Sequence, residues 1–302
     1  MLQPLYGHQS KASSAALYCP DAFISPIEVE DAVTRALTED LGRAGDVTSI
    51  ATVPADAEAR AVVIARATGS IAGLPIVEQV MRRLAPDAQI IAHARDGDAV
   101  PAKTKLLTVT GNARAVLAAE RTALNFIGHM SGIATATASL VAKVAGTQTR
   151  VVCTRKTTPG LRALQKYAVR CGGGFNHRFG LDDAVLIKDN HIAVAGGIRP
   201  ALARAKSVVG HLVKIEIEVD TLDQLREVLA TGLADVLLVD NFTPPMLTEA
   251  VALVGGRMVI EASGGITHDN AAEIAATGVD YISSGAITHS APNLDIALDI
   301  EI

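Results

Sequence analysis

The densest group of chemically active side chains in this sequence lies in residues 154–192. The run contains seven lysines and arginines and two histidines, which are Arg155, Lys156, Arg162, Lys166, Arg170, Arg178, Lys188, His177 and His191. Three aspartates oppose them there, although the formal net charge of the whole chain is −5. Because positive charge collects at one place in an acidic protein, the run indicates a site for an anionic ligand.

Two groups of these cations closely follow short apolar runs. Arg155 and Lys156 come after residues 151–153, and Lys188 comes after residues 185–187. Short apolar runs predict buried strands, and parallel α/β proteins bind ligands at the carboxyl ends of their strands. The cations are therefore expected at one edge of a parallel sheet.

A loop of three glycines lies between the two cationic groups. Gly172, Gly173 and Gly174 come shortly before His177 and Arg178. Glycine lets the backbone adopt positive φ or approach a ligand closely. The alternative, surface cations beside a plain turn, explains any single residue but not a set placed at two strand ends and one glycine loop. We therefore expect a binding site here.

The run TRKTTPGLRALQKYAVRCGGGFNHRFGLDDAVLIKDNHI, residues 154–192, resembles the quinolinate phosphoribosyltransferase family. The likeness continues from about residue 26 to the C-terminus. Within it, ERTALNFIGHMSGIAT resembles the family's helix whose arginine enters the active site of the neighbouring subunit. The resemblance implies this role for Arg121 and a homodimer or higher homo-oligomer. From its spacing alone, Arg121 is more typical of an exposed salt-bridge partner.

Composition places the chain among ordinary globular proteins. It has 302 residues, of which 49% are hydrophobic and 20% charged, and this length suffices for two domains. Tryptophan is absent and aromatic residues make up 3% of the chain. Aliphatic side chains must therefore fill the core, which favours helices layered on a parallel sheet and an α/β fold.

The same composition argues against several functional classes. No apolar run is long enough to cross a membrane, and no charged segment followed by a long apolar one opens the chain, so we expect neither a membrane protein nor a secreted one. Cys19, Cys153 and Cys171 lack metal-ligand spacing and predict reduced thiols in a cytoplasm. The acidic balance, without a basic stripe of interleaved aromatics, argues against a nucleic-acid partner.

Periodicity divides the chain into an arm, two domains and a terminal segment. Residues 1–24 show no sustained period and predict a loose arm. Residues 25–130 mix helical and strand patterns and predict a small α+β sandwich domain. Residues 131–290 predict an α/β barrel that carries the catalytic site. Residues 291–302 are expected to pack back on the N-terminal domain, and from Leu294 onward their apolar spacing is helix-like.

Local signals set the ends of the elements in the first domain. Ser25 and Glu28 form the pattern of a capping box, with proline at the first helical position between them. Residues 42–49 predict a loop. A long helical pattern runs from about residue 113 to 144, and two glycines at positions 128 and 132 are expected to interrupt it.

Six short apolar runs separated by helical segments predict the strands of the barrel. They are Val151–Cys153, Val185–Ile187, Val213–Val219, Val236–Val239, Met258–Ala262 and Tyr281–Ser283. The last four start at intervals of 23, 22 and 23 residues, which suits repeated compact βα units. The family resemblance implies an incomplete α/β barrel of seven strands.

Carboxylates follow the middle strands of this set. Glu216 and Glu218 are two residues apart in KIEIEVD, so they share one face of a strand. A buried salt bridge to Lys214 or Lys188 is one interpretation of Glu216. Glu218 is nearer the end of the strand and is the stronger functional candidate, together with Asp240 at the end of the next strand.

The resemblance implies the reaction of quinolinate with phosphoribosyl pyrophosphate, which gives nicotinate mononucleotide, pyrophosphate and CO₂. The predicted quinolinate-binding residues are Arg121, Arg155, Lys156, His177, Arg178 and Lys188. Arginine binds carboxylates in a bidentate manner, and Lys156 and Lys188 are expected nearest the reacting centre. No general base is needed, because the pyridine nitrogen already has a lone pair, so His177 is assigned to binding.

The second substrate is expected at the later strands. The predicted phosphoribosyl pyrophosphate-binding residues are Glu218, Asp240, Ser263, Gly264, Gly265, Ser284 and Gly285. Glu218 and Asp240 are expected to hold ribose hydroxyls or Mg²⁺, which arrives with the pyrophosphate, and to stabilise the cation that develops at the anomeric carbon. The loops ASGGI and SSGAI are expected to offer backbone N–H groups and serine hydroxyls to the 5′-phosphate.

Two other functions remain open at this point. One is a phosphoribosyltransferase for a monocarboxylate such as nicotinate, although Arg121, Arg155, Arg178 and Lys188 are many cations for one carboxylate. The other is a regulatory module that binds a sugar phosphate without turnover. Glu218 and Asp240 argue against this module, because they would repel a phosphate unless a metal or a developing cation lay between.

Overall fold

The computed structural model describes residues 17–301. The chain forms two compact units, and the first contains the chain up to Thr135 together with Ala163–Gly172 and Pro292–Ile302. The second contains Ala136–Arg162 and Gly173–Ala291. The sequence did not indicate that Ala163–Gly172, in the middle of the cationic run, groups with the first unit. Within residues 17–301 no helix is both long and apolar enough to span a bilayer.

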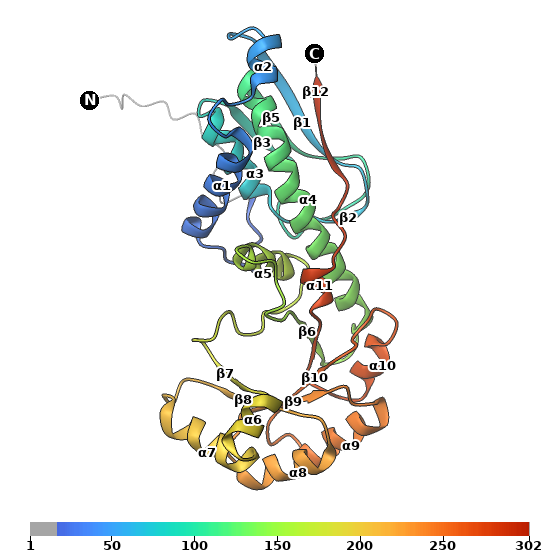
Figure 1. Ribbon diagram of the computed structural model, residues 1–302. Coiled ribbons are helices and arrows are strands. Elements are labelled where there is room, and N and C mark those ends of the chain that lie inside the picture. The colour runs from blue at the N-terminus through green and yellow to red at the C-terminus, as the bar shows by residue number, and fades with distance from the viewer. Residues whose placement is uncertain (1–16, 302) are drawn as a thin grey trace, which may run out of the picture. The chain divides into compact units, whose positions relative to one another are not determined.

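An antiparallel sheet forms the centre of the first unit (Figure 1). Its strands run in the order β12-β1-β5-β3. Their bounds are Ile296–Glu301 for β12, Glu58–Ala65 for β1, Thr104–Asn112 for β5 and Gln89–Ala92 for β3. A separate short pair joins β2 (Gly69–Ser70) to β4 (Ala99–Val100). Aliphatic side chains of β1 and β5 such as Val62 and Leu107 are buried, as expected for a core almost free of aromatic residues.

Five helices accompany this sheet in the chain up to Cys171. They are α1 (Pro26–Leu41), α2 (Val47–Thr52), α3 (Leu74–Leu84), α4 (Ala113–Lys143) and α5 (Arg162–Cys171). The predicted capping box of α1 is wrong, because the Ser25 side chain makes no capping hydrogen bond, although Pro26 does occupy the first turn. The predicted loop over residues 42–49 is also wrong in part. Asp46 accepts hydrogen bonds from the backbone of Thr48 and Ser49 and so starts α2.

Helix α4 runs without interruption from Ala113 to Lys143, so the expected break at its glycines is wrong. These glycines instead make room for the returning C-terminal segment. A Cβ atom at Gly132 would overlap the carbonyl of Pro292, and the backbone N–H of Leu294 donates to the carbonyl of Gly128 at 2.9 Å. The cost of glycine inside a helix is therefore offset by close contact between two backbones.

Beyond this contact the chain forms β12 and not a helical segment. β12 pairs antiparallel with β1 over the register from Arg60 with Glu301 to Ala65 with Ile296. The edge of β1 offers hydrogen-bonding groups to an extended segment, and these outweigh the weak helical spacing of a short apolar run.

The described end of the expected N-terminal arm is packed. Leu17, Cys19 and Ile24 are buried, and the backbone N–H of Cys19 donates to the hydroxyl of Tyr167 at 3.1 Å. The rest of that arm, residues 1–16, lies outside the described residues. Residues 17–24 are thus part of the first unit.

The second unit is a parallel sheet with helices along its outer side (Figure 1). Its strands are β6 (Arg150–Val152), β7 (Val185–Ile187), β8 (Ile215–Val219), β9 (Val236–Asp240), β10 (Val259–Ser263) and β11 (Tyr281–Ser283). The helices are α6 (Asp189–Ala195), α7 (Ile198–Val208), α8 (Leu222–Thr231), α9 (Pro244–Val254), α10 (Ala271–Ala276) and α11 (Ala286–His289). The prediction of an α/β fold is confirmed, and each strand overlaps one of the predicted runs.

The sheet order is β6-β11-β10-β9-β8-β7, so the first strand of the unit pairs with the last, as in a barrel. A seventh position is occupied by a single residue. Phe175 forms a parallel bridge with Val152, and its backbone N–H donates to the carbonyl of Val151 at 2.8 Å. Within the described residues the sheet therefore has six strands and one further rung, and it is open between Phe175 and β7. A single rung leaves no apolar run in the sequence.

Candidate functional site

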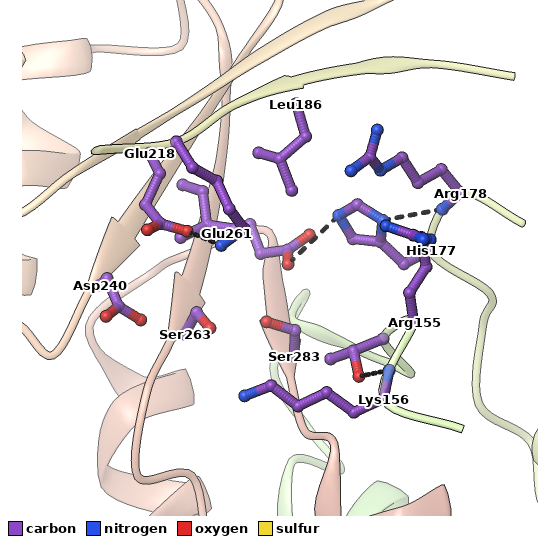
Figure 2. A pocket seen from close by; sticks show the side chains of 13 residues that line it. Arg155, Lys156, His177, Arg178, Leu186, Glu218, Asp240, Glu261, Ser263 and Ser283 are labelled. Atoms are coloured by element: carbon purple, nitrogen blue, oxygen red, sulfur yellow. Dashed lines mark hydrogen bonds and ion pairs between the residues drawn. The ribbon is translucent and has the colours of Figure 1, made fainter. Parts of the chain in front are cut away.

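One cavity of about 380 Å³ opens at the carboxyl ends of the barrel strands (Figure 2). Residues from β7, β8, β9, β10 and β11 and from the segments after β6 and Phe175 line it. They are Thr154, Arg155, Lys156, His177, Arg178, Leu186, Lys188, Glu218, Leu238, Asp240, Glu261, Ser263 and Ser283. Eight of the residues predicted from the sequence are among them, so the predicted strand ends do meet at one place.

The parallel register explains why these side chains share the cavity. Ser263 lies opposite Asp240 and Glu261 lies opposite Leu238 in the pairing of β10 with β9. Glu218 also lies opposite Leu238, in the pairing of β8 with β9. Because side chains alternate between the two faces of a strand, residues two apart form successive layers on the inner face. Asp240 and Ser263 form the upper layer, which is polar. Leu238 lies in the lower layer beside Glu218 and Glu261.

Arg155 and Arg178 form the cationic side of the cavity. The Nε atom of each is buried and has no hydrogen-bond partner. Arg178 is held by one guanidinium bond, from Nη1 to the carbonyl of Ala184 at 3.1 Å. Burial, and then the neighbouring charge of Arg155, lower the pKa of Arg178. Two like charges with unsatisfied donors favour an incoming anion such as a carboxylate.

The two lysines differ in their surroundings. Lys188 forms an ion pair with Glu218, whose side chain is largely buried. The backbone of Lys156, by contrast, is held on both sides. Its N–H donates to Thr154 Oγ1 at 3.0 Å and its carbonyl accepts from Thr288 Oγ1 at 2.9 Å. The backbone of Lys156 is therefore fixed while its side chain extends along the cavity wall (Figure 2).

Below the cationic side lies an acidic cluster of His177, Glu216 and Glu261. His177 Nε2 is 2.9 Å from Glu216 Oε2 and 3.7 Å from Glu261 Oε1. Both glutamates are buried, and Oε1 of each has no hydrogen-bond partner. Burial, and then the negative charge of Glu216, raise the pKa of Glu261 to about 7. Glu216 therefore pairs with His177, so the alternative interpretation of a salt bridge to Lys214 or Lys188 is wrong; Lys214 instead pairs with Asp235.

The hydrogen bonds of His177 decide its tautomer. Its Nδ1 accepts the backbone N–H of Arg178 at 2.8 Å, so Nδ1 cannot carry a proton. The ring proton is on Nε2, where it points to Glu216. The three side chains have ligand atoms within 4.8 Å of one another, but a protonated Nε2 has no lone pair for a metal ion. The donor set does not fit a metal in this arrangement.

Glu218 and Asp240 offer oxygen ligands at the other side of the cavity. Asp240 Oδ2 accepts from the side chain of Asn241 at 2.6 Å. Mg²⁺ prefers carboxylate and phosphate oxygens and usually keeps several waters. These two carboxylates, both on the cavity wall, therefore fit a magnesium ion that arrives bound to a pyrophosphate.

The predicted phosphate loops are only partly on the cavity wall. Ser263 lines the cavity, but Gly264, Gly265, Ser284 and Gly285 do not. The N–H of Ser284 donates to the carbonyl of Val152 at 3.1 Å, so it is not available to a phosphate. Gly264 has positive φ and passes so close to Asn241 that a Cβ would overlap its side chain, which is the reason for glycine there.

Arg121 does not line the cavity. It lies on α4 within the first unit, whereas every residue of the cavity wall belongs to the second. The predicted role of Arg121 in the site of a neighbouring subunit therefore stays a prediction.

The sequence predictions gave no site role to Glu261 on the cavity wall or to Glu216 beneath it, and they missed Ser283 on the wall. Glu261 is in the middle of an apolar strand, where a buried carboxylate is costly without a partner. A charged residue at an inward position of a predicted strand was the signal available. Ser283 comes one residue before the predicted Ser284. Because side chains alternate along a strand, the two serines lie on opposite faces.

Fold and cavity together define an α/β-barrel enzyme whose substrates are small anions. The family model described as quinolinate phosphoribosyl transferase, C-terminal domain, matches residues 133–299, and the N-terminal domain of the same family matches residues 46–131. This chain belongs to the quinolinate phosphoribosyltransferase family.

Known relatives support this membership over nearly the whole chain. A probable nicotinate-nucleotide pyrophosphorylase (carboxylating) of Bacillus subtilis is 41% identical over 276 residues, which cover 91% of this chain and 94% of the relative. The nicotinate-nucleotide pyrophosphorylase (carboxylating) of Mycobacterium leprae is 44% identical over 277 residues, or 89% of this chain and 96% of the relative. The solved nicotinate-nucleotide pyrophosphorylase of Francisella tularensis has a TM-score of 0.89 at 40% identity and covers 93% of this chain and 98% of that one.

Proposed function

We propose that this chain is a quinolinate phosphoribosyltransferase of NAD biosynthesis. It transfers the phosphoribosyl group of phosphoribosyl pyrophosphate to quinolinate and releases pyrophosphate and CO₂, which leaves nicotinate mononucleotide. Family membership and the names of the relatives support this reaction.

The observation that carries the proposal is the division of one cavity into two sides. Arg155, Arg178 and His177 lie on one side, and Glu218 and Asp240 lie on the other (Figure 2). A pyridine dicarboxylate fits the cationic side, because guanidinium groups bind carboxylates in a bidentate manner. A ribose that develops positive charge fits the acidic side. The ring nitrogen then meets the anomeric carbon between them.

On the cationic side, the side chains hold and orient the substrate. Arg155 and Arg178 have buried donors without partners, so a substrate carboxylate would satisfy them. Lys156 and Lys188 add positive charge near the carboxylate that leaves as CO₂. The ring nitrogen becomes cationic on ribosylation, and this charge stabilises the carbanion that decarboxylation creates.

On the acidic side, Glu218 and Asp240 hold the ribose and stabilise the positive charge at the anomeric carbon. Bound Mg²⁺ would neutralise the pyrophosphate and help it to leave. Ser263 and the loop that follows it are the candidates for holding the 5′-phosphate, since Ser263 reaches the cavity.

The direct test is to incubate the protein with quinolinate, phosphoribosyl pyrophosphate and Mg²⁺ and to measure nicotinate mononucleotide and CO₂. Parallel reactions contain nicotinate in place of quinolinate, or no Mg²⁺. Product from quinolinate with Mg²⁺ is expected. Product from nicotinate alone would show a transferase for a monocarboxylate, and binding without product would show a sugar-phosphate-binding module.

Variants test the division of the cavity. Arg178→Ala should weaken quinolinate binding by roughly 2 to 5 kcal/mol, since it removes a buried partner of a carboxylate. Affinity for phosphoribosyl pyrophosphate should change far less. The control is Arg204→Ala on the exposed side of α7, which removes the same side chain away from the cavity. Equal losses for both substrates in calorimetric titrations would show that the two sides are assigned wrongly.

The proposal includes a homodimer in which Arg121 completes the quinolinate site of the partner. Arg121 lies on α4, and the resemblance of this helix to the family helix whose arginine enters the neighbouring subunit supports this role. In a twofold dimer, Arg121→Ala then damages the partner's site, whereas Lys156→Ala damages the site of its own chain.

Mixing the two inactive variants tests this arrangement. When they are unfolded together and reassembled in equal amounts, half of the dimers are mixed and each has one intact site, so roughly a quarter of the activity should return. Size analysis must first show that mixed dimers form. A mixed sample as inactive as its parents would show that Arg121 serves its own chain.

We place the enzyme in the cytoplasm. Cys19, Cys153 and Cys171 are all buried and form no disulfide, which supports a reducing compartment. Fluorescence microscopy of a tagged chain, compared with a tagged secreted control, tests the location. A signal outside the cytoplasm would contradict it.

A further inference from the structure

The proposed function so far gives no role to Glu216 and Glu261, the two glutamates that form the acidic cluster with His177. Its members come from separate parts of the barrel, since Glu216 is on β8, Glu261 is on β10 and His177 follows the rung at Phe175. Their polar atoms converge within 4.8 Å, and both glutamates are at least nine-tenths buried. Two buried carboxylates at such close range are strongly unfavourable if both carry negative charge.

The charges around the cluster are not sufficient to keep both carboxylates ionised. Nδ1 of His177 accepts a backbone N–H, so His177 meets Glu216 through its Nε2–H, and its effect on the pKa of Glu261 is smaller than the effects of burial and of Glu216. Lys188 faces the cluster from the segment after β7, but its ammonium is paired with Glu218. Arg178 feels the negative charge of Glu216 from the loop beyond His177. The cluster therefore holds a proton, and Glu261 is the member that carries it.

The hydrogen bonds also indicate that Glu261, and not Glu216, carries the proton. Glu216 receives the Nε2–H of His177 and so is stabilised as the anion. Glu261 interacts with the hydroxyl of Ser283, and its Oε1 has no hydrogen-bond partner. Burial and the charge of Glu216 raise the pKa of Glu261 to about 7, which suits an acid that must give up a proton near neutral pH.

Glu261 also lies where the reaction needs an acid. It lines the cavity, whereas Glu216 does not. In Figure 2, Glu261 lies between the group of Glu218, Asp240 and Ser263 and the group of His177, Arg178 and Arg155. The ring nitrogen bonds to the ribose on the acidic side, and the ring carboxylates are held on the cationic side. The ring carbon next to the nitrogen, which loses CO₂, is thus expected near the boundary that Glu261 occupies.

We propose that Glu261 is the acid that protonates this ring carbon when CO₂ leaves, and that Glu216 and His177 keep Glu261 protonated until then. In this step the bond between the ring carbon and the carboxylate carbon breaks, and its electron pair stays on the ring carbon. The O–H bond of Glu261 then breaks as the new C–H bond forms. Glu261 becomes a carboxylate and regains its proton from solvent before the next turnover. The inference rests on the proposed function.

The lysines of the cavity are less suitable for this task. Lys156 and Lys188 are assigned to holding negative charge on the substrate, and each would lose its positive charge if it gave up a proton. Lys188 is also paired with Glu218. A neutral carboxylic acid delivers a proton without removing a cation from the quinolinate site.

The test separates ribosyl transfer from the later protonation. Wild-type protein and Glu261→Gln are mixed in excess with quinolinate, phosphoribosyl pyrophosphate and Mg²⁺, and single turnovers are stopped with acid at increasing times. Pyrophosphate reports the first step and nicotinate mononucleotide reports the last. In Glu261→Gln we expect pyrophosphate to form within about threefold of the wild-type rate, while nicotinate mononucleotide forms at least about 100-fold more slowly. The ribosylated ring that still carries both carboxylates should accumulate.

Two further variants control the interpretation. Glu261→Asp keeps an acid at the same position, so it should form nicotinate mononucleotide faster than Glu261→Gln does. Glu273→Gln makes the same chemical change on the exposed side of α10 and should behave as wild type. Quinolinate affinity within about threefold of wild type would show that the Glu261→Gln cavity is intact.

Each other result overturns the inference. If pyrophosphate and nicotinate mononucleotide slow by the same factor in Glu261→Gln, then Glu261 acts before decarboxylation or only supports the fold. If neither slows, another group supplies the proton. If wild-type protein forms product from neither quinolinate nor nicotinate, the proposed function fails, and the role of Glu261 fails with it.

Discussion

Two buried acidic centres, one in each unit, differ in how completely their oxygens are hydrogen-bonded. In the first unit, Asp96 is fully buried, and its Oδ2 accepts from the N–H of Gly73 at 2.8 Å and from the hydroxyl of Tyr167 at 2.9 Å. Its Oδ1 accepts from the N–H of Leu74 at 3.0 Å. In the second unit, Glu216 and Glu261 each leave Oε1 without a partner.

The pKa values alone do not separate these centres. Burial raises the pKa of Asp96 to about 7, against the opposing effect of its three hydrogen bonds. Burial and the charge of Glu216 raise the pKa of Glu261 to a similar value. Asp96, however, accepts hydrogen bonds from the backbone at the start of α3 and from the side chain of Tyr167 on α5. Both of its oxygens therefore hold parts of the first unit together. The glutamates retain unused oxygens beside a cavity. Hydrogen-bond saturation, rather than the pKa shift, separates a structural carboxylate from one available for chemistry.

The largest effect on stability is expected from Asp96→Ala. The change leaves the N–H groups of Gly73 and Leu74 and the hydroxyl of Tyr167 without their acceptor. Each buried unsatisfied donor costs about 1 to 3 kcal/mol, so the free energy of unfolding should fall by at least about 3 kcal/mol. Urea denaturation at pH 6 measures it. If the free energy of unfolding fell by less than about 1 kcal/mol, Asp96 would not be a structural carboxylate, and the contrast with Glu261 would fail.

The second expected effect is a pH dependence of stability shared by both centres. Asp96 and Glu261 have pKa values raised above their usual range in the folded chain, so the folded state binds more protons than the unfolded state between about pH 4 and 7. The free energy of unfolding should therefore fall as pH rises through this interval, by at most about 1.4 kcal/mol per pH unit for each group.

Matched variants assign this slope. Asp96→Asn is neutral at every pH and should flatten the slope between pH 4 and 7, and adding Glu261→Gln should flatten it further. Urea denaturation at pH 5, 6, 7 and 8 gives the slopes. An Asp96→Asn variant with the full wild-type slope would contradict the assignment to Asp96.

The smallest expected effect is that of Glu261→Gln on stability. Glutamine keeps the shape of the side chain, and it cannot ionise beside the negative charge of Glu216. The free energy of unfolding at pH 7 should change by less than about 1 kcal/mol in either direction. Differential scanning calorimetry beside Asp96→Ala tests it. A loss as large as that of Asp96→Ala would erase the difference between the two centres.

Local sequence signals predicted much of the fold. Short apolar runs of regular spacing correspond to the strands β6 to β11, because a strand buried on both faces must be apolar almost throughout. The cations and carboxylates after these runs share one cavity, since parallel strands end at the same edge of a sheet. Family resemblance, and not spacing, indicated the reaction.

Other features follow from contacts between distant parts of the chain. The helix α4 continues through Gly128 and Gly132 because the C-terminal segment packs against it. Residues 296–301 are a strand because the edge of β1 is free to pair with them. Neither partner is near in sequence, so the local pattern predicted a broken helix and a helical segment instead.

The sequence by itself determined the strands, their order along the chain and the charged residues at their ends, because these depend on local periodicity. Only the tertiary structure decided which charges meet. It paired Glu216 with His177 and not with a lysine, and it placed Glu261 on the cavity wall. It also formed the seventh rung at Phe175, which brings His177 and Arg178 to the site. These outcomes depend on distances between strands that are far apart in the sequence, and such distances are set only once the sheet has formed and its inner side chains are removed from water.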